Sequence, residues 1–550
     1  MQPRDFQALG TGDYDLLVVG GGIHGLATAY AAAGRGLRVA LVDADDFGAS
    51  TSFNHQRTAH GGLRSLQTGR LGYARESILE RRALARMAPR LLRPLPFLVG
   101  TYRSVLRNRL AIGAAFRIDR FLGRDRNEAV EPELHLPPAK LTSRAATLKL
   151  FPGVRQDRLT GGANWYDYQI VHANRLTIAF AEGAESRGAR LVNYAAAVTP
   201  LKDGGRVTGM RVRDAITGDE VDVRARLTLN AAGARAGDLM RQFGVSHDLP
   251  LLKAMNLVTS KPASDIALGA SPFALRATGD KRASHGAMLT LTPWHGRAMV
   301  GTFQSTSFKQ PSDLPVTAAE VDAAIADANS AFPALGLTRD DITLVHRGIV
   351  PAQKGPNGAA LLSTPQILDH DRDGVAGAMT VIGVKYTTAR RVGARAAEAA
   401  IRRLGQPSLR GWKPAHDILP GAGIADHEAL TIETARAVGL ELAPPIIRHL
   451  NAIYGDRSAA IVRLMAERTD WRMPIVPGRP NVGAEIVHAI RFEMAMTLAD
   501  IVIRRTELGA MGHPGKDIVS ACAQIAADEL DWSADRRDRE VATVDGFYAS

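Results

Sequence analysis

Cysteine is almost absent from this sequence, since Cys522 is the only one in 550 residues. A single cysteine excludes an internal disulfide framework and any zinc or iron–sulfur site built from several cysteines, and it is typical of a reducing compartment. We therefore expect no metal site. If the protein performs redox chemistry, a bound organic cofactor must carry it.

Long apolar runs are absent as well. No stretch approaches the roughly 20 consecutive apolar residues that a membrane-spanning helix needs. The N-terminus has no charged start followed by an apolar segment ahead of the first predicted strand, so we expect no cleaved signal. The sequence predicts a cytoplasmic protein that is either soluble or attached to the cytoplasmic face of a membrane.

Aromatic residues are few, at 5%, whereas basic residues are in excess. The net charge of +12 and the pI near 9.9 would attract an anionic substrate, anionic lipid or nucleic acid, although an arginine-rich composition alone explains them equally well. Because no nucleic-acid-binding motif accompanies the charge, we expect no nucleic-acid partner. The length, with 45% hydrophobic residues, predicts two or three globular domains.

The first structural signal is a strand, a glycine-rich turn, a helix and a second strand. The apolar run 14–19 predicts a strand, the alanine-rich run 27–35 predicts a helix, and residues 38–42 predict the next strand. This order indicates a βαβ unit.

Three glycines occupy the turn of this unit as Gly20-x-Gly22-x-x-Gly25. They allow a tight turn, close approach of the backbone to a pyrophosphate, and close packing of helix on strand. Asp43 follows the second strand, where an acidic residue can accept hydrogen bonds from an adenosine ribose. The motif predicts an adenine-dinucleotide site without separating NAD from FAD. We interpret His24, inside the turn, as a solvent-facing residue.

The next segment favours FAD. Ser50, Thr51 and Ser52 form a loop suited to the second phosphate of a long cofactor, and the segment TSFNHQRTAHGGLRSL continues from Thr51 through His60 and Arg64. This stretch resembles the FAD-dependent glycerol-3-phosphate dehydrogenase family, in which it reads approximately T-S-S-x-S-S-K-L-I-H-G-G-L-R-Y-L.

The resemblance extends over nearly the whole chain. Further motifs of the family appear in the same order, at Asn230–Gly233, Pro293–Trp294, Gly301–Thr302, Gly383–Thr388 and Arg504–Thr506. The resemblance implies that Gly233, Gly383 and Thr387 contact FAD. It also implies an oxidoreductase of glycerol metabolism that passes electrons to a quinone at a membrane surface, with oxygen as the alternative acceptor.

Membership in this family implies oxidation of sn-glycerol 3-phosphate to dihydroxyacetone phosphate by hydride transfer to flavin. A base must take the hydroxyl proton, and His60 is the candidate by position; the alternative is that His60 only orients the flavin. Lys385 would place a positive charge near the reduced flavin or the substrate anion. Arg64 can grip a phosphate or carboxylate through two hydrogen bonds.

Four departures from the family pattern concern the substrate. Ser65 follows the arginine of HGGLR, where the family has an aromatic residue, and Asn256 stands where it has a histidine. Gln304 stands at the last position of the family's "GTTD", and Val350 stands where the family has the arginine of "GVRP". Loss of that arginine removes a contact of about 1.5–3 kcal/mol, or ten- to a hundredfold in affinity. Arg347 lies at an odd spacing from Val350 and so on the opposite strand face. Either Lys354, Arg57 and Arg64 compensate, or the substrate is different.

Three alternatives therefore stay open. The first is an FAD-dependent oxidoreductase of the same fold that acts on another polyol phosphate, a hydroxy acid or an amine. The second is a non-catalytic flavin-binding protein. The third is an NAD-dependent enzyme, which gives the Gly383–Thr388 segment no role.

We expect an α/β fold with an FAD-binding βαβ (Rossmann-like) domain, an inserted mixed-sheet substrate domain and a helical C-terminal domain. The segment 75–90 has the pattern of an exposed amphipathic helix, and 484–506 that of one long helix. The predicted boundaries are 12–90, 165–235 and 345–405 for the flavin domain, 91–164 and 236–344 for the substrate domain, together the oxidoreductase region 1–410, and 415–550 for the helical domain.

Overall fold

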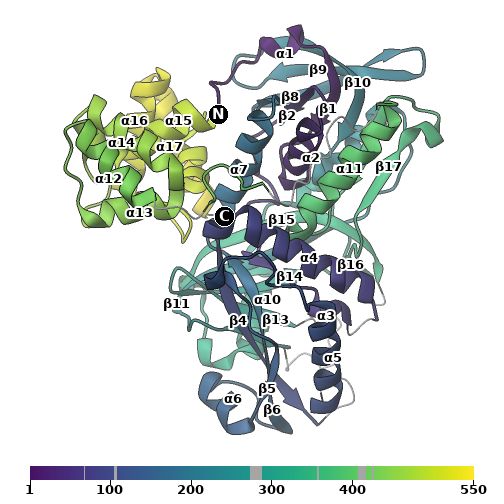
Figure 1. The fold of residues 1–550 in the computed structure, drawn as a ribbon, viewed down its shortest axis with the longest axis vertical. Coiled ribbons are helices and arrows are strands. Elements are labelled where there is room, and N and C mark those ends of the chain that lie inside the picture. The colour runs from purple at the N-terminus through teal and green to yellow at the C-terminus, as the bar shows by residue number, and fades with distance from the viewer. Residues whose placement is uncertain are drawn as a thin grey trace. The chain divides into compact units, whose positions relative to one another are not determined.

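The computed structural model consists of two compact units, each built on its own sheet (Figure 1). Unit 1 comprises residues 1–53, 172–249 and 363–549, and unit 2 comprises residues 54–171 and 250–362. The structure describes residues 1–66, 69–103, 108–272, 288–355, 358–406, 417–423 and 427–549, without the side chains of Arg64 and Ser65.

The sheet of unit 1 has the order β17-β18-β10-β1-β2-β7, and β18, β10, β1, β2 and β7 run parallel. A hairpin, β8 and β9, extends β10 on one side, and β17 pairs antiparallel with β18. The strands are β1 (Tyr14–Val19), β2 (Val39–Val42), β7 (Arg190–Val192), β8 (Ala195–Asp203), β9 (Arg206–Asp214), β10 (Glu220–Asn230), β17 (Gln366–Asp369) and β18 (Ala378–Ile382).

Helix α2 lies at the centre of the helical layer of unit 1. Because many of its side chains are the small methyl groups of alanine, neighbouring helices can approach it closely, and both α7 and α11 pack against it. At Gly393 of α11, an added Cβ would lie 2.5 Å from the backbone of Ala27, so the two helices touch through their backbones. The helices of this layer and its surroundings are α1 (Ala8–Thr11), α2 (Ile23–Gly34), α7 (Ala173–Glu185), α8 (Ala236–Phe243) and α11 (Ala389–Arg403).

The βαβ unit predicted from the sequence is confirmed, with strands at Tyr14–Val19 and Val39–Val42 around α2. Each residue of β1 and β2 is buried, as their apolar sequences require. The segment around 227–233 proves to be the end of a longer strand, β10, which begins at Glu220 and pairs with β9 before it enters the parallel sheet.

The C-terminal part of unit 1 is helical, as expected. Its helices are α12 (His427–Ala437), α13 (Pro444–Tyr454), α14 (Ser458–Glu467), α15 (Gly483–Glu493), α16 (Lys516–Leu530) and α17 (Ala534–Ala549). The last of these was not predicted from the sequence. Cys522 lies in the apolar core between these helices, where burial raises the pKa of its thiol to about 12.

The prediction of one long helix over 484–506 is wrong. Helix α15 ends at Glu493, and Met494 adopts a left-handed conformation with φ of 55°. The chain then forms a wide turn over Asp500–Arg505, in which Thr506 donates from its backbone N–H and its hydroxyl to the carbonyl of Ile501, five residues earlier. Side-chain contacts with the flavin domain fix this break, and helical periodicity gives no signal of them.

The sheet of unit 2 has the order β16-β15-β11-β14-β13-β12-β4-β6-β3, with β5 beside β6. Its strands are β3 (Thr58–Ala59), β4 (Leu92–Tyr102), β5 (Lys140–Thr142), β6 (Leu159–Ile170), β11 (Leu251–Pro262), β12 (Ala267–Ala270), β13 (Leu289–Trp294), β14 (Arg297–Gln304), β15 (Ile342–Gly355) and β16 (Gly358–Leu361). Its helices are α3 (Leu63–Leu66), α4 (Leu71–Met87), α5 (Arg109–Leu122), α6 (Arg144–Leu150) and α10 (Ala318–Ala331).

The unit boundaries differ from the predicted domain boundaries in four places. Residues 54–90, 165–171 and 345–362 were expected in the flavin domain and lie in unit 2, whereas residues 236–249 were expected in the substrate domain and lie in unit 1. The reason is strand pairing, since β3 pairs with β6 and β15 pairs with β11, all within the second sheet. Sequence periodicity predicts a strand but does not identify its sheet.

Helix α4 is also more buried than its charge pattern predicted. Glu80 and Arg81 are inside unit 2, and Arg81 pairs with the buried carboxylate of Asp167. On the opposite side, Arg82 binds Asp125 at 2.7 Å. The basic residues of this helix therefore hold the fold of unit 2 together.

Along the part of the chain that the structure describes, no helix is long and apolar enough to cross a membrane.

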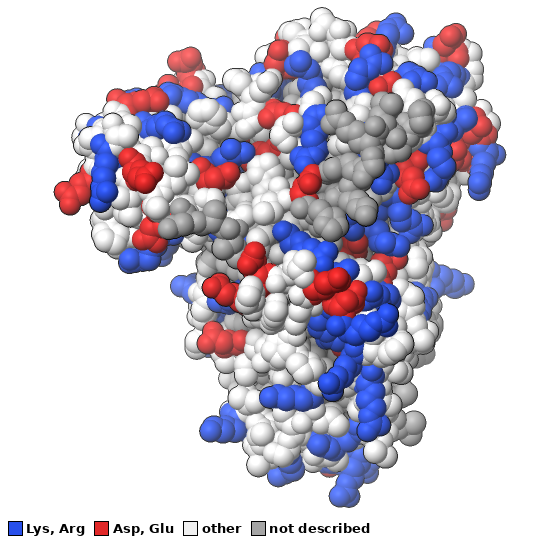
Figure 2. Space-filling model, viewed as in Figure 1, with Lys and Arg blue, Asp and Glu red and all other residues white. Residues whose placement is uncertain are grey.

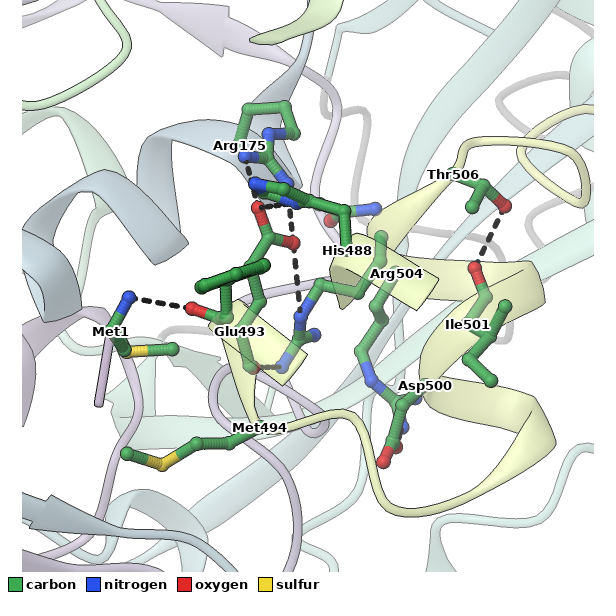
Figure 3. Close-up of polar contacts among 12 residues, drawn as sticks. Met1, Arg175, His488, Glu493, Met494, Asp500, Ile501, Arg504 and Thr506 are labelled. Atoms are coloured by element: carbon green, nitrogen blue, oxygen red, sulfur yellow. Dashed lines mark hydrogen bonds and ion pairs between the residues drawn. The ribbon is translucent and has the colours of Figure 1, made fainter. Parts of the chain in front are cut away.

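A buried ion network joins the C-terminal helices to the loop after β2. Asp46 accepts hydrogen bonds from Arg504 Nε at 2.8 Å and from both terminal nitrogens of Arg505 at 2.8 and 2.7 Å. Arg175 of α7 makes two hydrogen bonds, of 2.7 and 2.6 Å, to Glu493. Figure 3 shows Arg175 facing Glu493, and Arg504 beside Asp500. These residues come from four separate segments of unit 1.

Burial opposes ionisation of Asp46, but Arg505 and Arg504 outweigh it and lower its pKa to about 2. The stabilisation from this lowered pKa is fully present above the unfolded value of about 4 and is lost as the pH falls through about 2. Asp46 is therefore ionised at every pH at which the protein would ordinarily be studied.

We predict that Arg505→Ala lowers the free energy of unfolding by about 3–5 kcal/mol, because it leaves the carboxylates of Asp46 and Glu493 buried with one cation fewer. Urea unfolding would measure this. Arg211→Ala is the matched control, since Arg211 forms an exposed pair with Asp222 and its loss should lower the free energy of unfolding far less. Equal losses in the two variants would contradict a structural role for the network.

Candidate active site

The glycine-rich turn after β1 is built on two close backbone contacts. Gly20 has φ of +116°, and an added Cβ there would lie 2.5 Å from the carbonyl oxygen of Ala231. A Cβ at Gly25 would lie 1.8 Å from the carbonyl oxygen of Gly20. Neither position accepts a side chain, so the start of α2 is held against the ends of both β1 and β10. The reasons given for these glycines from the sequence agree with this geometry.

Gly22 forms the N-cap of α2, and Ser52 reaches the same turn from the loop after β2. The Ser52 hydroxyl accepts the N–H of Ile23 at 2.9 Å, and a Cβ at Gly22 would lie 3.2 Å from that hydroxyl oxygen. Ser50 is exposed and Thr51 half-buried. Ser52 therefore contacts the turn, and Ser50 and Thr51 stay predicted phosphate ligands.

Asp43 lies at the end of β2 and is tied to the same turn. Its carboxylate accepts the N–H of Gly21 through one oxygen and that of Asp45, at 2.8 Å, through the other. Burial raises the pKa of Asp43 to about 7, although the two backbone donors act in the opposite direction. A carboxyl group with this pKa is half protonated near neutrality, and hydroxyl donors from a ribose would favour its ionised form.

The remaining predicted cofactor residues lie at the same edge of the sheet of unit 1. Gly233 follows β10 with φ of +58°, and nothing lies within 4 Å of the position of its absent Cβ. Gly383 follows β18, Thr387 is buried, and Lys385 is exposed at the start of the next turn. Because β18, β10 and β1 are parallel, their carboxyl ends and these residues form one crevice edge, where ligands of such sheets bind.

His60 lies in unit 2, and half of its side chain is exposed. Its Nδ1 is 3.6 Å from Oδ2 of Asp167, a distance that suits an ion pair but exceeds a hydrogen bond. Asp167 also accepts the N–H of Gly61 at 2.7 Å and the indole N–H of Trp165 at 3.1 Å. Burial opposes its ionisation, but Arg81 and His60 outweigh this effect and lower the pKa of Asp167. An ionised carboxylate thus faces one nitrogen of His60.

A second group of residues in unit 2 was not singled out as a site from the sequence. Arg57 is buried, and its guanidinium carbon lies 5.2 Å from the ring centre of Trp294. Burial and then the charge of Arg57 lower the pKa values of His55 and His346 well below the usual range, so both imidazoles are neutral. Burial also lowers the pKa of Arg347. Arg57 was named only as a compensating cation, and two histidines 291 positions apart give no sequence signal of proximity.

The positions that depart from the family pattern have partners within unit 2. Asn256 is buried, and its side-chain oxygen accepts the hydroxyl of Thr302 at 2.9 Å. Val350 is partly buried and packs against the apolar cluster of Leu252, Ala352 and Ala359. Gln304 is half-buried and Lys354 is exposed. The side chains of Arg64 and Ser65 fall outside the described residues.

Two family models together match most of the chain. Residues 15–399 match the model described as FAD dependent oxidoreductase, and residues 415–537 match the C-terminal domain of alpha-glycerophosphate oxidase. A curated relative named glycerol-3-phosphate dehydrogenase, from Mycobacterium leprae (strain TN), is 30% identical over 98% of this chain and 88% of its own. This chain is an FAD-dependent oxidoreductase of the glycerol-3-phosphate dehydrogenase family.

Other comparisons agree with this assignment. A glycerol-3-phosphate dehydrogenase from Synechocystis sp. is 29% identical over 98% of this chain and 97% of its own. The solved structure of the glycerol-3-phosphate dehydrogenase from Bacillus halodurans complexed with FAD has a TM-score of 0.73 and 22% identity, covering 98% of this chain and 95% of that chain. At this identity, the similarity to the solved structure shows the fold.

The residues of unit 1 suit the FAD that this family binds. Gly22 carries no side chain that would keep a pyrophosphate from the start of α2, and Gly20 and Gly25 hold that start against the strands. The carboxyl group of Asp43 lies at the end of the next strand. The assignment of FAD from the sequence is confirmed, and that of an NAD-dependent enzyme is excluded.

We predict that the affinity of the apoprotein for FAD rises with pH, by up to about tenfold per unit below pH 7, because ribose hydroxyls favour the ionised form of Asp43. Titration of flavin fluorescence at several pH values between about 5 and 8 would measure this. Asp43→Asn should flatten the profile and weaken binding at high pH. Asp45→Asn, at the exposed neighbour, should keep the pH dependence. A flat wild-type profile would contradict the role given to Asp43.

Proposed function

We propose that this flavoprotein oxidises sn-glycerol 3-phosphate to dihydroxyacetone phosphate. The observation that carries the proposal is that unit 2 contains both a buried guanidinium, at Arg57, and the His60–Asp167 pair, and that, besides burial, the charges of Arg57 and His60 both lower the pKa of His55. The guanidinium suits a small anion and the His60–Asp167 pair suits proton removal. The names of the relatives, glycerol-3-phosphate dehydrogenases at 29% and 30% identity, point to the same substrate.

Arg57 is the proposed ligand of the phosphate group. Its guanidinium offers planar, paired donors that match phosphate oxygens. Together with burial, its charge lowers the pKa values of both His55 and His346. Because these imidazoles are neutral, either can donate one N–H to a phosphate oxygen without adding charge. Arg64 and Lys385, predicted from the sequence, remain further candidates for this role.

His60 is the proposed base. If Asp167 holds the Nδ1–H of the ring, the lone pair of the neutral imidazole is on Nε2, which can then take the hydroxyl proton of the substrate. Asp167 would stabilise the imidazolium that forms, and Arg81 and Gly61 keep that carboxylate in place. Bound FAD supplies the acceptor for the hydride that leaves the same carbinol carbon. Loss of one hydride and one proton converts the alcohol to the ketone.

The substrate is proposed rather than assigned because the surroundings of Val350 are apolar. A phosphate could not be held there, so the proposal depends on Arg57. Another polyol phosphate, a hydroxy acid or an amine would place other demands on the same residues, and a non-catalytic flavin-binding protein would place none.

We predict that the holoprotein, mixed anaerobically with sn-glycerol 3-phosphate, loses its oxidised-flavin absorbance, whereas glycerol has little effect. His60→Asn should lower kcat by about 10²- to 10⁴-fold with little change in KM. Arg57→Lys keeps the charge but loses the paired donors, so it should raise KM by about tenfold or more. Stopped-flow absorbance would give both constants.

Two controls keep the roles separate. Lys149→Ala removes an exposed lysine of α6 in the same unit and should change neither constant. Asp167→Asn should lower kcat and shift its pH profile, as expected of a residue that acts through His60. Bleaching by a hydroxy acid or an amine, and not by glycerol 3-phosphate, would show that the substrate class is different. No bleaching by any of these compounds would favour the non-catalytic alternative.

We further propose that unit 2 attaches to an anionic membrane surface through helix α5. Leu110, Ile118 and Phe121 of this helix are exposed, at 87%, 42% and 67%. Arg117 and Arg120 are exposed beside them, whereas Asp119, the only acidic residue of the helix, is buried. Figure 2 shows mainly basic side chains around α5 and α6. Apolar residues flanked by arginines fit the interface of an anionic bilayer, where a quinone acceptor would be dissolved.

We predict that the protein sediments with anionic vesicles at low salt and is partly released by high salt. The double variant Leu110→Ser/Phe121→Ser should sediment much less, because it loses the apolar part of the contact. Leu430→Ser, at an exposed leucine of α12, is the matched control and should bind as the wild type does. Equal binding to neutral and anionic vesicles would count against the role of charge, and full binding of the double variant against α5.

A further inference from the structure

His24 occupies the last position before Gly25 in the glycine-rich turn, and its interpretation as a solvent-facing residue is wrong. The Nε2 atom of its ring is buried. An added Cβ at Gly383 would lie 2.3 Å from Nδ1, Cε1 and Nε2 of this ring. The imidazole therefore covers Gly383, and glycine at that position is explained by the ring above it.

His24 is half-buried, and the buried Nε2 atom of its imidazole lacks a hydrogen-bond partner among the described residues. Burial lowers the pKa of His24 to about 4, so the ring is neutral at physiological pH. A buried polar atom without a partner destabilises the folded protein and is rare in native structures. A ligand that arrives at this place would supply the missing partner.

The order of the strands indicates which part of FAD lies there. In the sheet, the strands lie side by side in the order β18-β10-β1-β2. The turn that suits the pyrophosphate follows β1, and Asp43, which suits the adenosine ribose, follows β2. Gly383 follows β18, on the other side of β1. A dinucleotide that extends along this edge from Asp43 through the pyrophosphate site has its flavin half on the side of Gly383.

We propose that His24 positions the flavin half of FAD through a hydrogen bond between Nε2 and the ribityl chain or the isoalloxazine ring. Hydroxyl, carbonyl and ring nitrogen atoms in that half can pair with either tautomer of a neutral imidazole. The bond forms on the side of the sheet edge away from Asp43. Gly383 is required because any side chain there would displace the ring.

The test compares FAD with ADP, which carries only the adenosine and pyrophosphate half, on the full-length apoprotein. His24→Leu should weaken FAD about tenfold and leave the affinity for ADP unchanged. The thermal stability of the apoprotein should not fall, because the substitution removes an unsatisfied buried nitrogen. The rise in melting temperature on addition of FAD should be smaller than in the wild type.

Three further variants sharpen the result. His24→Gln keeps a polar group at a similar reach and should restore part of the affinity. Gly383→Ala should show the same selective loss as His24→Leu, since it displaces the ring. Thr28→Val is the control, because the hydroxyl of Thr28 donates to the backbone carbonyl of His24, at 2.7 Å, and leaves the imidazole unchanged.

Unchanged affinity for FAD in both His24→Leu and Gly383→Ala would overturn the inference. Equal weakening of FAD and ADP would also overturn it, since the contact would then lie in the adenosine half. The inference rests on bound FAD and not on the identity of the substrate. Its failure is therefore distinct from failure of the proposed function, in which FAD binds normally and glycerol 3-phosphate does not reduce it.

Discussion

The cofactor half of this protein depends on the contact between the start of α2 and the ends of its neighbouring strands. Gly20 touches the backbone of Ala231, and Gly25 touches the backbone of Gly20. These two contacts fix where α2 begins, and so where the N–H groups of its first turn point. The remaining cofactor residues follow strands that are parallel to β1, so their positions at the same edge are a consequence of the sheet.

The cofactor site could be predicted from the sequence because its signals are local. A strand, a glycine turn and an acid at the end of the next strand are defined by spacing alone, and Asp43 indeed lies at that turn. The contact of Ser52 with Ile23, and that of His24 with Gly383, were not predictable in this way. Both depend on which loop folds back over the turn, which spacing does not contain.

The substrate side was less predictable for the same physical reason. The surroundings of Arg57 come from β13, β15 and the segment before β3, which are far apart in the chain. The resemblance predicts an arginine where this chain has Val350, but the apolar cluster that Val350 joins is seen only in the fold. The helix break at Met494 could not be predicted for the same reason. The side chain of Asn193, about three hundred residues earlier, donates to the carbonyl of Met494 at 2.8 Å.

Asp46 lies three residues after Asp43, and its two arginine partners lie at the far end of the chain. The short loop from Asp43 to Asp46 therefore contacts the cofactor site at one end and the C-terminal helical region at the other. By thermodynamic reciprocity, any free energy that FAD contributes to ordering this loop is also contributed to docking of those helices, and the reverse holds equally. A ligand that orders this loop at the dinucleotide site therefore also stabilises the docked C-terminal helices.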